Sequence, residues 1–193
     1  MAPERLKSPR LRLFVALDLP EAVRAPLAEW TRAAFDLPDL RPVRPEALHV
    51  TLVFLGYQYE RDVERIAAAA FSAPAPAFRL TAEDVTGVPR GRPRLFALGL
   101  VDAGGALGAW QQGLSDRLAA LGVYEPEKRS FWPHVTLARA KRGRNTRGVE
   151  VPTLTAGLRR PFQTSEITLY RSTLRAQGAV YDPLAQGKKM PVH

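Results

Sequence analysis

Cysteine is absent from this chain of 193 residues, and histidine occurs only three times. The absence of cysteine excludes a disulfide framework, a thiolate nucleophile, cysteine-ligated zinc and iron–sulfur clusters. No apolar run approaches the roughly 20 residues that a membrane-spanning helix needs, and residues 1–12 lack the apolar block of a signal peptide. We therefore expect no membrane partner and a cytoplasmic location.

Acidic residues are few relative to basic ones. The chain carries 28 lysines and arginines against 19 aspartates and glutamates, a net charge of +9, and 23 of the 28 basic residues are arginine. Such a surface favours polyanions, RNA or DNA above all, although the charge can also serve solubility alone. Apolar residues make up 46% of the chain, enough for one sizeable core, so we expect a single bilobed domain over residues 1–193.

Hydrophobic patterns with periods of two and of 3.6 residues predict strands and helices that do not alternate regularly. The predicted strands are Leu11–Leu17, Leu48–Leu55, Phe78–Thr86, Arg94–Leu100 and Phe131–Arg139, followed by a hairpin of Phe162–Leu174 and Ala179–Leu184. The predicted helices are Glu21–Phe35, Glu60–Phe71 and Ala106–Leu121. Because strands outnumber helices without a βαβ rhythm, the pattern favours an α+β sheet protein over a doubly wound one.

Turn-forming and basic residues mark the connections. The hairpin is expected to turn at Gln177 and Gly178, and the chain to fray beyond Gln186. Two connections are rich in arginine, the proline–glycine turn at 88–94 and the loop at 141–148, whose composition predicts flexibility. Both are candidates for contacts with a nucleic acid, and solvated surface arginine is the alternative interpretation.

The tetrapeptide His-Val-Thr-Leu occurs twice, at 49–52 and at 134–137. From the 15 valines, 11 threonines and 25 leucines of the chain, a given histidine precedes Val-Thr-Leu by chance about once in 1,700 trials. The third histidine, His193, is the last residue. Coincidence is therefore a poor explanation, and the repeat indicates two equivalent strands related by a pseudo-two-fold axis.

Side chains alternate between the two faces of a strand, so the histidine and threonine of each copy share one face. Val50, Leu52 and Phe54 are expected to pack in the core, as are Val135 and Leu137. His49, Thr51, His134 and Thr136 are then expected to line one cleft. Arg139 has the core-facing parity of an ideal strand, so it reaches the cleft only if the strand ends or bulges there.

Two imidazoles and two hydroxyls fit acid–base chemistry on a phosphate ester. One imidazole can act as base and the other as acid near neutral pH, while hydroxyls donate to phosphoryl oxygens. We expect no metal and no other cofactor, because each His-x-Thr offers one nitrogen ligand and no carboxylate stands at ligand spacing. The chain also lacks a P-loop, a Gly-x-Ser-x-Gly elbow and a dinucleotide-binding glycine motif.

The sequence resembles the two-histidine (2H) phosphoesterases, and among them the RNA 2′,3′-cyclic phosphodiesterases, also called 2′-5′ RNA ligase-like proteins. The resemblance spans nearly the whole chain. It is carried by the opening Leu-Phe-Val-Ala-Leu-Asp-Leu-Pro at 13–20, the two motifs 85 residues apart with their flanks at 48–56 and 133–139, and the closing segments at 169–174 and 178–181.

The resemblance implies a bilobed α+β fold with two pseudo-symmetric antiparallel sheets around a central cleft. It also implies metal-independent hydrolysis of a 2′,3′-cyclic phosphate to a 2′-phosphate. By this resemblance His49 is the proton donor to the leaving 3′ oxygen and His134 the proton acceptor that activates water. Thr51 and Thr136 hold the phosphate, and we add Arg139 as a further phosphate-binding candidate.

The substrate implied is RNA with a 2′,3′-cyclic phosphate end, or a cyclic nucleotide, and we expect the enzyme to be a monomer. Two alternatives stay open: ligation of a cyclic phosphate end to a 5′-hydroxyl, which uses the same groups, and a non-catalytic RNA-binding module. The candidates for stacking on a base of the substrate are Phe14, Phe131, Trp132 and Tyr181. Phe14 and Trp132 lie within predicted strands and fit a place in the core better.

Overall fold

The computed structural model describes residues 8–175 and 178–187, in which nine strands form one antiparallel sheet. The strands are β1 (Arg10–Asp18), β2 (Leu40–Pro42), β3 (His49–Tyr59), β4 (Phe78–Val88), β5 (Leu95–Val101), β6 (His134–Ala140), β7 (Phe162–Thr164), β8 (Ile167–Arg175) and β9 (Gly178–Gln186). The α-helices are α1 (Glu21–Ala34), α2 (Val63–Ala70) and α3 (Ala106–Ala120), and the short 3-10 helices are η1 (Pro45–Ala47), η2 (Glu60–Asp62) and η3 (Ala156–Arg159). The α+β class is as expected.

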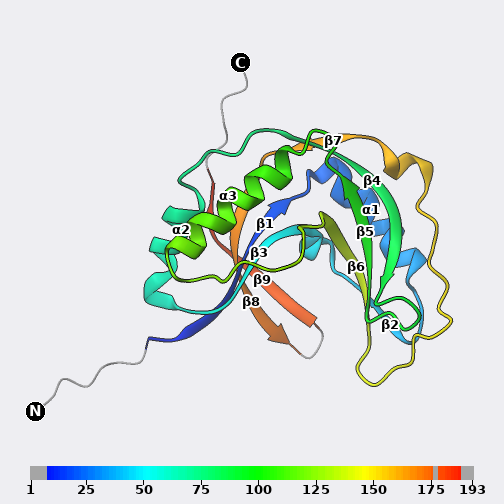
Figure 1. Ribbon diagram of the computed structural model, residues 1–193. Helices are drawn as coiled ribbons and strands as arrows, with labels where there is room; N and C mark the ends of the chain where they lie inside the picture. Colours follow the sequence, from blue (N-terminus) through cyan, green and yellow to red (C-terminus); the bar gives the residue numbers. More distant parts are fainter. Residues whose placement is uncertain (1–7, 176–177, 188–193) are drawn as a thin grey trace, which may run out of the picture.

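The sheet runs in the order β7-β4-β5-β6-β3-β1-β8-β9, with β2 on β6. At its middle, β3 and β6 are joined by one residue pair, Val50 with Val135. The sheet therefore has two lobes, which Figure 1 shows splayed apart: a first lobe of β3, β1, β8 and β9, and a second lobe of β2, β6, β5, β4 and β7. The two predicted sheets are in fact halves of one sheet.

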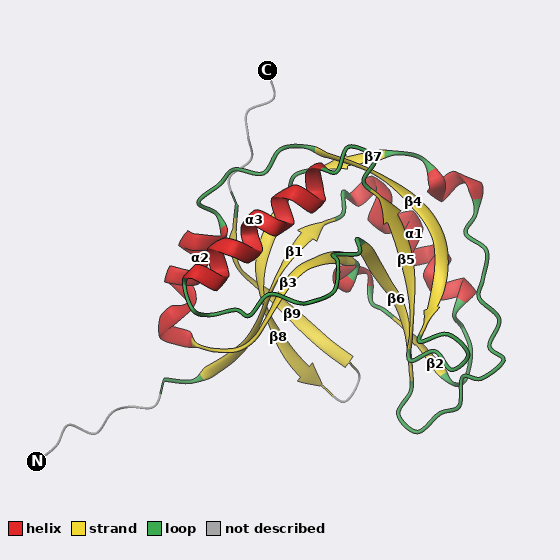
Figure 2. Cartoon of the chain, viewed as in Figure 1, coloured by secondary structure: helices red, strands yellow, loops and turns green. Residues whose placement is uncertain are grey.

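Each lobe is covered by a helix that follows a strand of the other lobe (Figure 2). Helix α1 follows β1, and the Phe35 ring at its end packs 5.1 Å from the Phe96 ring of β5. Helix α3 follows β5, and its Gln111 side chain donates to the Leu52 carbonyl of β3 at 3.1 Å. This exchange ties the lobes together around their junction.

Several predicted boundaries change for local reasons. Strand β3 continues past Gly56, which takes a positive φ of 67° within the strand instead of ending it. The predicted helix at 60–71 starts with the 3-10 turn η2, and β6 begins only at His134. Gln177 and the residues beyond Gly187 lie outside the described residues, so the turn and the frayed end stay predictions.

The single strand predicted over 162–174 is wrong, because this segment crosses between the lobes. Strand β7 pairs with β4 in the second lobe, whereas β8 pairs with β1 in the first. Between them the Thr164 hydroxyl donates to the Asp18 carbonyl at 2.7 Å, and the Asp18 amide donates to the Glu166 carbonyl at 2.8 Å. These bonds fix the crossing. In the described part of the chain, no helix is long and apolar enough to cross a membrane.

Candidate active site

The two His-x-Thr motifs meet where the lobes join. In the antiparallel register set by Val50 and Val135, His49 lies toward Thr136 and Thr51 toward His134. Val50 and Val135 themselves are fully buried, while the four motif side chains are partly exposed. The alternation expected from the sequence therefore holds in both copies, and it directs two imidazoles and two hydroxyls to one face.

Both strands carry a β-bulge directly after the threonine. Ala16 pairs with Thr51 and Val15 with Val53, so Leu52 is an extra residue in β3. Ala97 pairs with Thr136 and Phe96 with Ala138, so Leu137 is the extra residue in β6. An extra residue reverses the side-chain parity beyond it. The bulges thus occupy equivalent places in the two lobes.

The residues after the bulges show this reversal. Phe54, predicted to lie in the core, is 40% exposed and faces the cleft, so that prediction is wrong. Arg139 reaches the same cleft because of the equivalent bulge in β6. The sequence predicted that Arg139 would reach the cleft only if the strand ended or bulged there, and this condition is met. Phe54 is covered by Arg12, whose guanidinium carbon lies 4.5 Å from the ring centroid.

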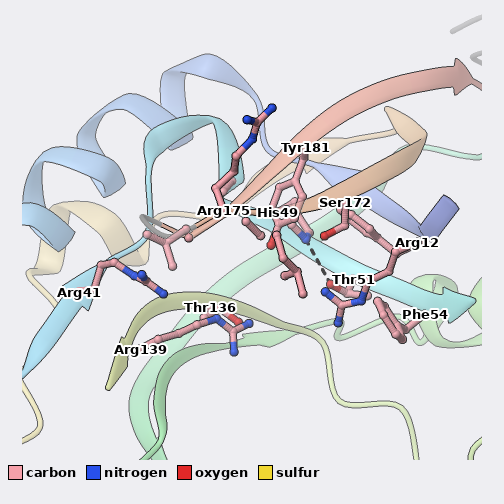
Figure 3. Close-up of a pocket in the computed structure, with 16 residues that line it drawn as sticks. Arg12, Arg41, His49, Thr51, Phe54, Thr136, Arg139, Ser172, Arg175 and Tyr181 are labelled. Atoms are coloured by element: carbon pink, nitrogen blue, oxygen red, sulfur yellow. Dashed lines mark hydrogen bonds between the residues drawn. The ribbon is translucent and has the colours of Figure 1, made fainter. Parts of the chain in front are cut away.

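A cavity of about 430 Å³ opens at this junction, and Figure 3 shows the side chains that surround it. His49, Thr51, Thr136 and Arg139 line it, together with Arg12, Arg41, Phe54, Ser172, Arg175 and Tyr181. No acidic residue is among the described residues that line the cavity. Four arginines around a space of this size fit an anionic ligand with one or more phosphates.

His134 does not line this cavity, so the prediction that all four motif side chains line one cleft holds for only three of them. His134 borders a neighbouring pocket of about 400 Å³, which it shares with Thr51, Phe54 and Trp132. The Trp132 ring stacks on the His134 ring at 4.4 Å and is 39% exposed, so the prediction of a core role for Trp132 is wrong. Phe131 also lines this pocket. The histidine pair thus stands between two cavities, with one histidine bordering each.

The His134 ring is oriented by the backbone. Its Nδ1 atom lies 2.8 Å from the Trp132 carbonyl oxygen, which can only accept a hydrogen bond. Nδ1 therefore carries the proton, and in the neutral ring Nε2 has a free lone pair. His49 has the equivalent partner, since its ring bonds to the backbone of Ala47, also two residues earlier. Its Nε2 lies 3.2 Å from the Thr51 hydroxyl oxygen.

His49 is enclosed by aromatic rings of the first lobe. Phe14 stacks on it at 5.0 Å, and Tyr181 meets it edge-on at 5.3 Å. This burial lowers the pKa of His49 to about 4, with smaller contributions from the charges of Arg139 and His134. His49 is therefore neutral at pH 7 in the free protein. Phe14 is buried, as the sequence predicted for a core residue, yet it also lines the cavity.

A partly buried carboxylate supports the wall behind Phe14. Asp18 accepts hydrogen bonds from the Thr168 hydroxyl at 2.6 Å and from the Tyr170 hydroxyl at 2.8 Å. The Tyr170 ring stacks on Phe14 at 5.3 Å. Burial raises the pKa of Asp18, partly offset by the hydrogen bonds it accepts, and burial and Asp18 together raise the pKa of Tyr170. This network holds the aromatic residues that hold His49.

Several residues that line the cavity were not predicted from the sequence. Arg12, Arg41 and Arg175 lie on three different strands and belong to no sequence motif. Only the fold brings them together. Ser172 is 7% exposed and its hydroxyl has no hydrogen-bond partner in the described part of the chain. Among the described residues, no three histidine, cysteine, aspartate or glutamate side chains are grouped so as to hold a metal ion.

The fold and the paired motifs define a phosphoesterase of the two-histidine type. The family model described as LigT like Phosphoesterase matches the chain twice in succession, over residues 17–96 and 98–181, with one His-x-Thr motif in each match. The chain belongs to this family. The double match agrees with the internal repeat and with the equivalent bulges in β3 and β6.

Relatives share most of their length with this chain. It is 30% identical to an RNA 2′,3′-cyclic phosphodiesterase of Escherichia coli, over 90% of this chain and 93% of that protein. It is 33% identical to the RNA 2′,3′-cyclic phosphodiesterase of Thermus thermophilus, over 90% of this chain and 88% of that protein. The crystal structure of E. coli LigT complexed with 3′-AMP superposes with a TM-score of 0.78 at 29% identity, covering 95% of this chain and all of that one.

Proposed function

We propose that this enzyme hydrolyses the 2′,3′-cyclic phosphate at the 3′ end of RNA to a 2′-phosphate. The observation that carries the proposal is the meeting of two His-x-Thr motifs at the lobe junction, where His49, Thr51 and Thr136 line an arginine-rich cavity and His134 borders the pocket beside it. Relatives that are called RNA 2′,3′-cyclic phosphodiesterases at about 30% identity support the choice of substrate.

In this mechanism His134 is the base. Its Nδ1 is engaged by the Trp132 carbonyl, so Nε2 can take the proton of a water molecule as the water oxygen attacks phosphorus. The bond between phosphorus and the 3′ oxygen breaks, and His49 gives its proton to that oxygen. The products are a 2′-phosphomonoester and a 3′-hydroxyl, and the proton gained by His134 replaces the one lost by His49.

His49 must be protonated to act as the acid, although its pKa of about 4 leaves it neutral in the free protein at pH 7. A bound phosphate supplies a negative charge in a cavity whose other charges are positive. It therefore opposes the effects of Arg139 and His134 and raises the pKa of His49. Substrate binding is in this way coupled to protonation of the acid, and the aromatic enclosure keeps water from competing for the proton.

Thr51 and Thr136 are proposed to donate to the non-bridging phosphoryl oxygens, since each lies across from a histidine in the register. Arg139 is proposed to neutralise the charge that builds on these oxygens. Its place after the β6 bulge aims it into the cavity beside Thr136 (Figure 3). A guanidinium can bond two phosphoryl oxygens at once, which a lysine cannot.

The test is hydrolysis of a 2′,3′-cyclic nucleotide in excess chelator, with phosphorus NMR to identify the product. The expected result is turnover that the chelator does not change and a product that is only the 2′-phosphate. A 3′-phosphate product would reverse the assignment of the leaving oxygen. Salt-dependent RNA binding without turnover of any cyclic phosphate would instead favour a binding module.

Replacement of Arg139 by alanine is expected to lower kcat by roughly 100-fold or more, the usual loss when one donor to a developing charge is removed. Arg139→Lys is expected to recover part of this loss. Because Arg139 also lowers the pKa of His49, Arg139→Ala should raise that pKa in an NMR titration. Arg79→Ala, at an exposed site on β4, serves as the control. An Arg139→Ala enzyme within threefold of wild type would contradict this role.

A second candidate function is 2′-5′ ligation, in which a 5′-hydroxyl takes the place of water. The pocket beside His134 favours it, because about 400 Å³ far exceeds the roughly 30 Å³ that one water occupies. Trp132 and Phe131 offer faces on which a base could stack. The test adds RNA with a 5′-hydroxyl to the hydrolysis assay: a 2′-5′ diester formed in competition with the 2′-phosphate would support ligation, and the 2′-phosphate alone would exclude it.

A further inference from the structure

Two arginine-rich segments, the turn at 88–94 and the loop at 141–148, form one surface although about 50 residues separate them. The Ala140 amide donates to the Arg94 carbonyl at 2.9 Å, and the Thr146 hydroxyl donates to the Pro93 carbonyl. Thr146 is 1% exposed, so its contact lies beneath the surface. The loop predicted to be flexible is therefore anchored to the turn at its beginning and in its middle.

A second set of bonds attaches the loop to the segment before β2. The Lys141 amide donates to the Asp39 carbonyl at 2.9 Å, and the Lys141 ammonium donates to the Pro38 carbonyl at 2.8 Å. Arg144 lies 3.5 Å from the Asp39 carboxylate. The basic segments are thus built onto the end of the second lobe (Figure 1).

Five cationic side chains line a pocket of about 330 Å³ in this surface, and we call them the basic platform: Arg92, Arg94, Lys141, Arg142 and Arg144. All five are exposed, and no acidic residue is among the described residues that line the pocket. Within the described part of the chain, no carboxylate pairs with Arg92, Arg94 or Arg142. Exposed like charges repel one another, so a site of this kind is stabilised by an anion.

The platform continues directly from the candidate active site. Strand β6 carries His134, Thr136 and Arg139 and then enters the loop at Lys141. Lys141 is the fifth residue after Thr136, and because Leu137 is an extra residue in the strand, the span is about four β-strand rises, or roughly 13 Å. That distance matches about four stacked nucleotides at roughly 3.4 Å each, and fewer for an extended strand.

We propose that the basic platform binds the phosphates of the RNA strand several nucleotides before the cyclic phosphate, so that the enzyme prefers RNA oligomers to mononucleotides. This inference rests on the proposed function for the direction of the strand. A terminal cyclic nucleotide fills the cavity alone, whereas a longer RNA reaches the platform as well. The platform therefore sets affinity for long substrates and leaves the chemical step untouched.

The experiment compares a cyclic mononucleotide with a ten-residue RNA that ends in a 2′,3′-cyclic phosphate. The variant Arg92→Glu/Arg142→Glu is expected to raise KM for the RNA about tenfold or more at low salt and to leave kcat/KM for the mononucleotide unchanged. The slope of log affinity for the RNA against log salt should flatten by about 1.4, since each single-strand phosphate contact contributes roughly 0.7. The control Arg65→Glu/Arg79→Glu makes the same change in net charge away from the platform, at exposed sites on α2 and β4.

An equal effect on both substrates, no effect on the RNA, or the same effect in the control variant would each overturn the proposal. Failure of the proposed function is recognised separately, because wild type would then turn over neither substrate. In that case, fluorescence anisotropy with the same RNA ending in a 3′-hydroxyl still measures the platform. Weaker RNA binding by Arg92→Glu/Arg142→Glu alone would support it, and equal binding by both variants would not.

Discussion

His49→Ala and His134→Ala are each expected to reduce kcat for a 2′,3′-cyclic nucleotide by about 100- to 10,000-fold, the usual contribution of one positioned acid or base. The reason is structural as well as chemical. His49 and His134 occupy equivalent places on β3 and β6, on either side of one residue pair, and no other described histidine is available to replace either. The measurement is initial rate at saturating substrate for both variants and for the double variant.

The double variant distinguishes two histidines that act in one catalytic step from two that contribute independently. Two groups that act in one step give losses that do not multiply, so the double variant should be little worse than the poorer single one. His193→Ala, at the third histidine and outside both His-x-Thr motifs, is the matched control and should keep full activity. Either single variant with more than a tenth of wild-type activity and an unchanged circular dichroism spectrum would remove the paired-histidine mechanism.

The motif residues could be found from the sequence because their signals are local. The alternation of a strand places His49 beside Thr51 and away from Val50, whatever the rest of the chain does. The second copy then supplies the partners by symmetry. Strand and helix positions followed for the same reason, since long periodic segments such as Ala106–Leu121 show their pattern within one element.

The residues around the motifs depend on features with no local signal. A bulge adds one residue to a strand without changing its composition, so Phe54 could not be told from a core residue and Arg139 could be placed only conditionally. Arg12, Arg41 and Arg175 meet only because β1, β2 and β8 surround one cavity. The segment at 162–174 has the composition of one strand, and only tertiary bonds through Thr164 and Asp18 divide it between lobes.

Acid is expected to destabilise the fold through His49. Its pKa is about 4 in the folded protein and near 6.5 when unfolded, so between these values the unfolded state binds more protons and gains stability. The stability that neutral His49 contributes to the folded state is fully present above pH 6.5 and is lost as pH falls toward 4. At roughly 1.4 kcal/mol per pKa unit, this loss of folding free energy amounts to about 3 kcal/mol. Urea unfolding at several pH values should show this loss for wild type relative to His49→Asn, in which the carboxylate contributions common to both proteins cancel.

The same titration tests how the acid becomes charged. Sulfate carries two negative charges from pH 4 to 7 and has the tetrahedral shape of phosphate, so it can occupy the arginine-lined cavity without changing its own protonation. Because an anion beside a histidine favours the imidazolium, saturating sulfate should raise the pKa of His49 by about one unit or more. By linkage, sulfate should bind more tightly as pH falls toward that pKa. A His49 resonance that titrates at the same pH with and without sulfate would separate phosphate binding from protonation of His49, and the role of acid would then pass to another group.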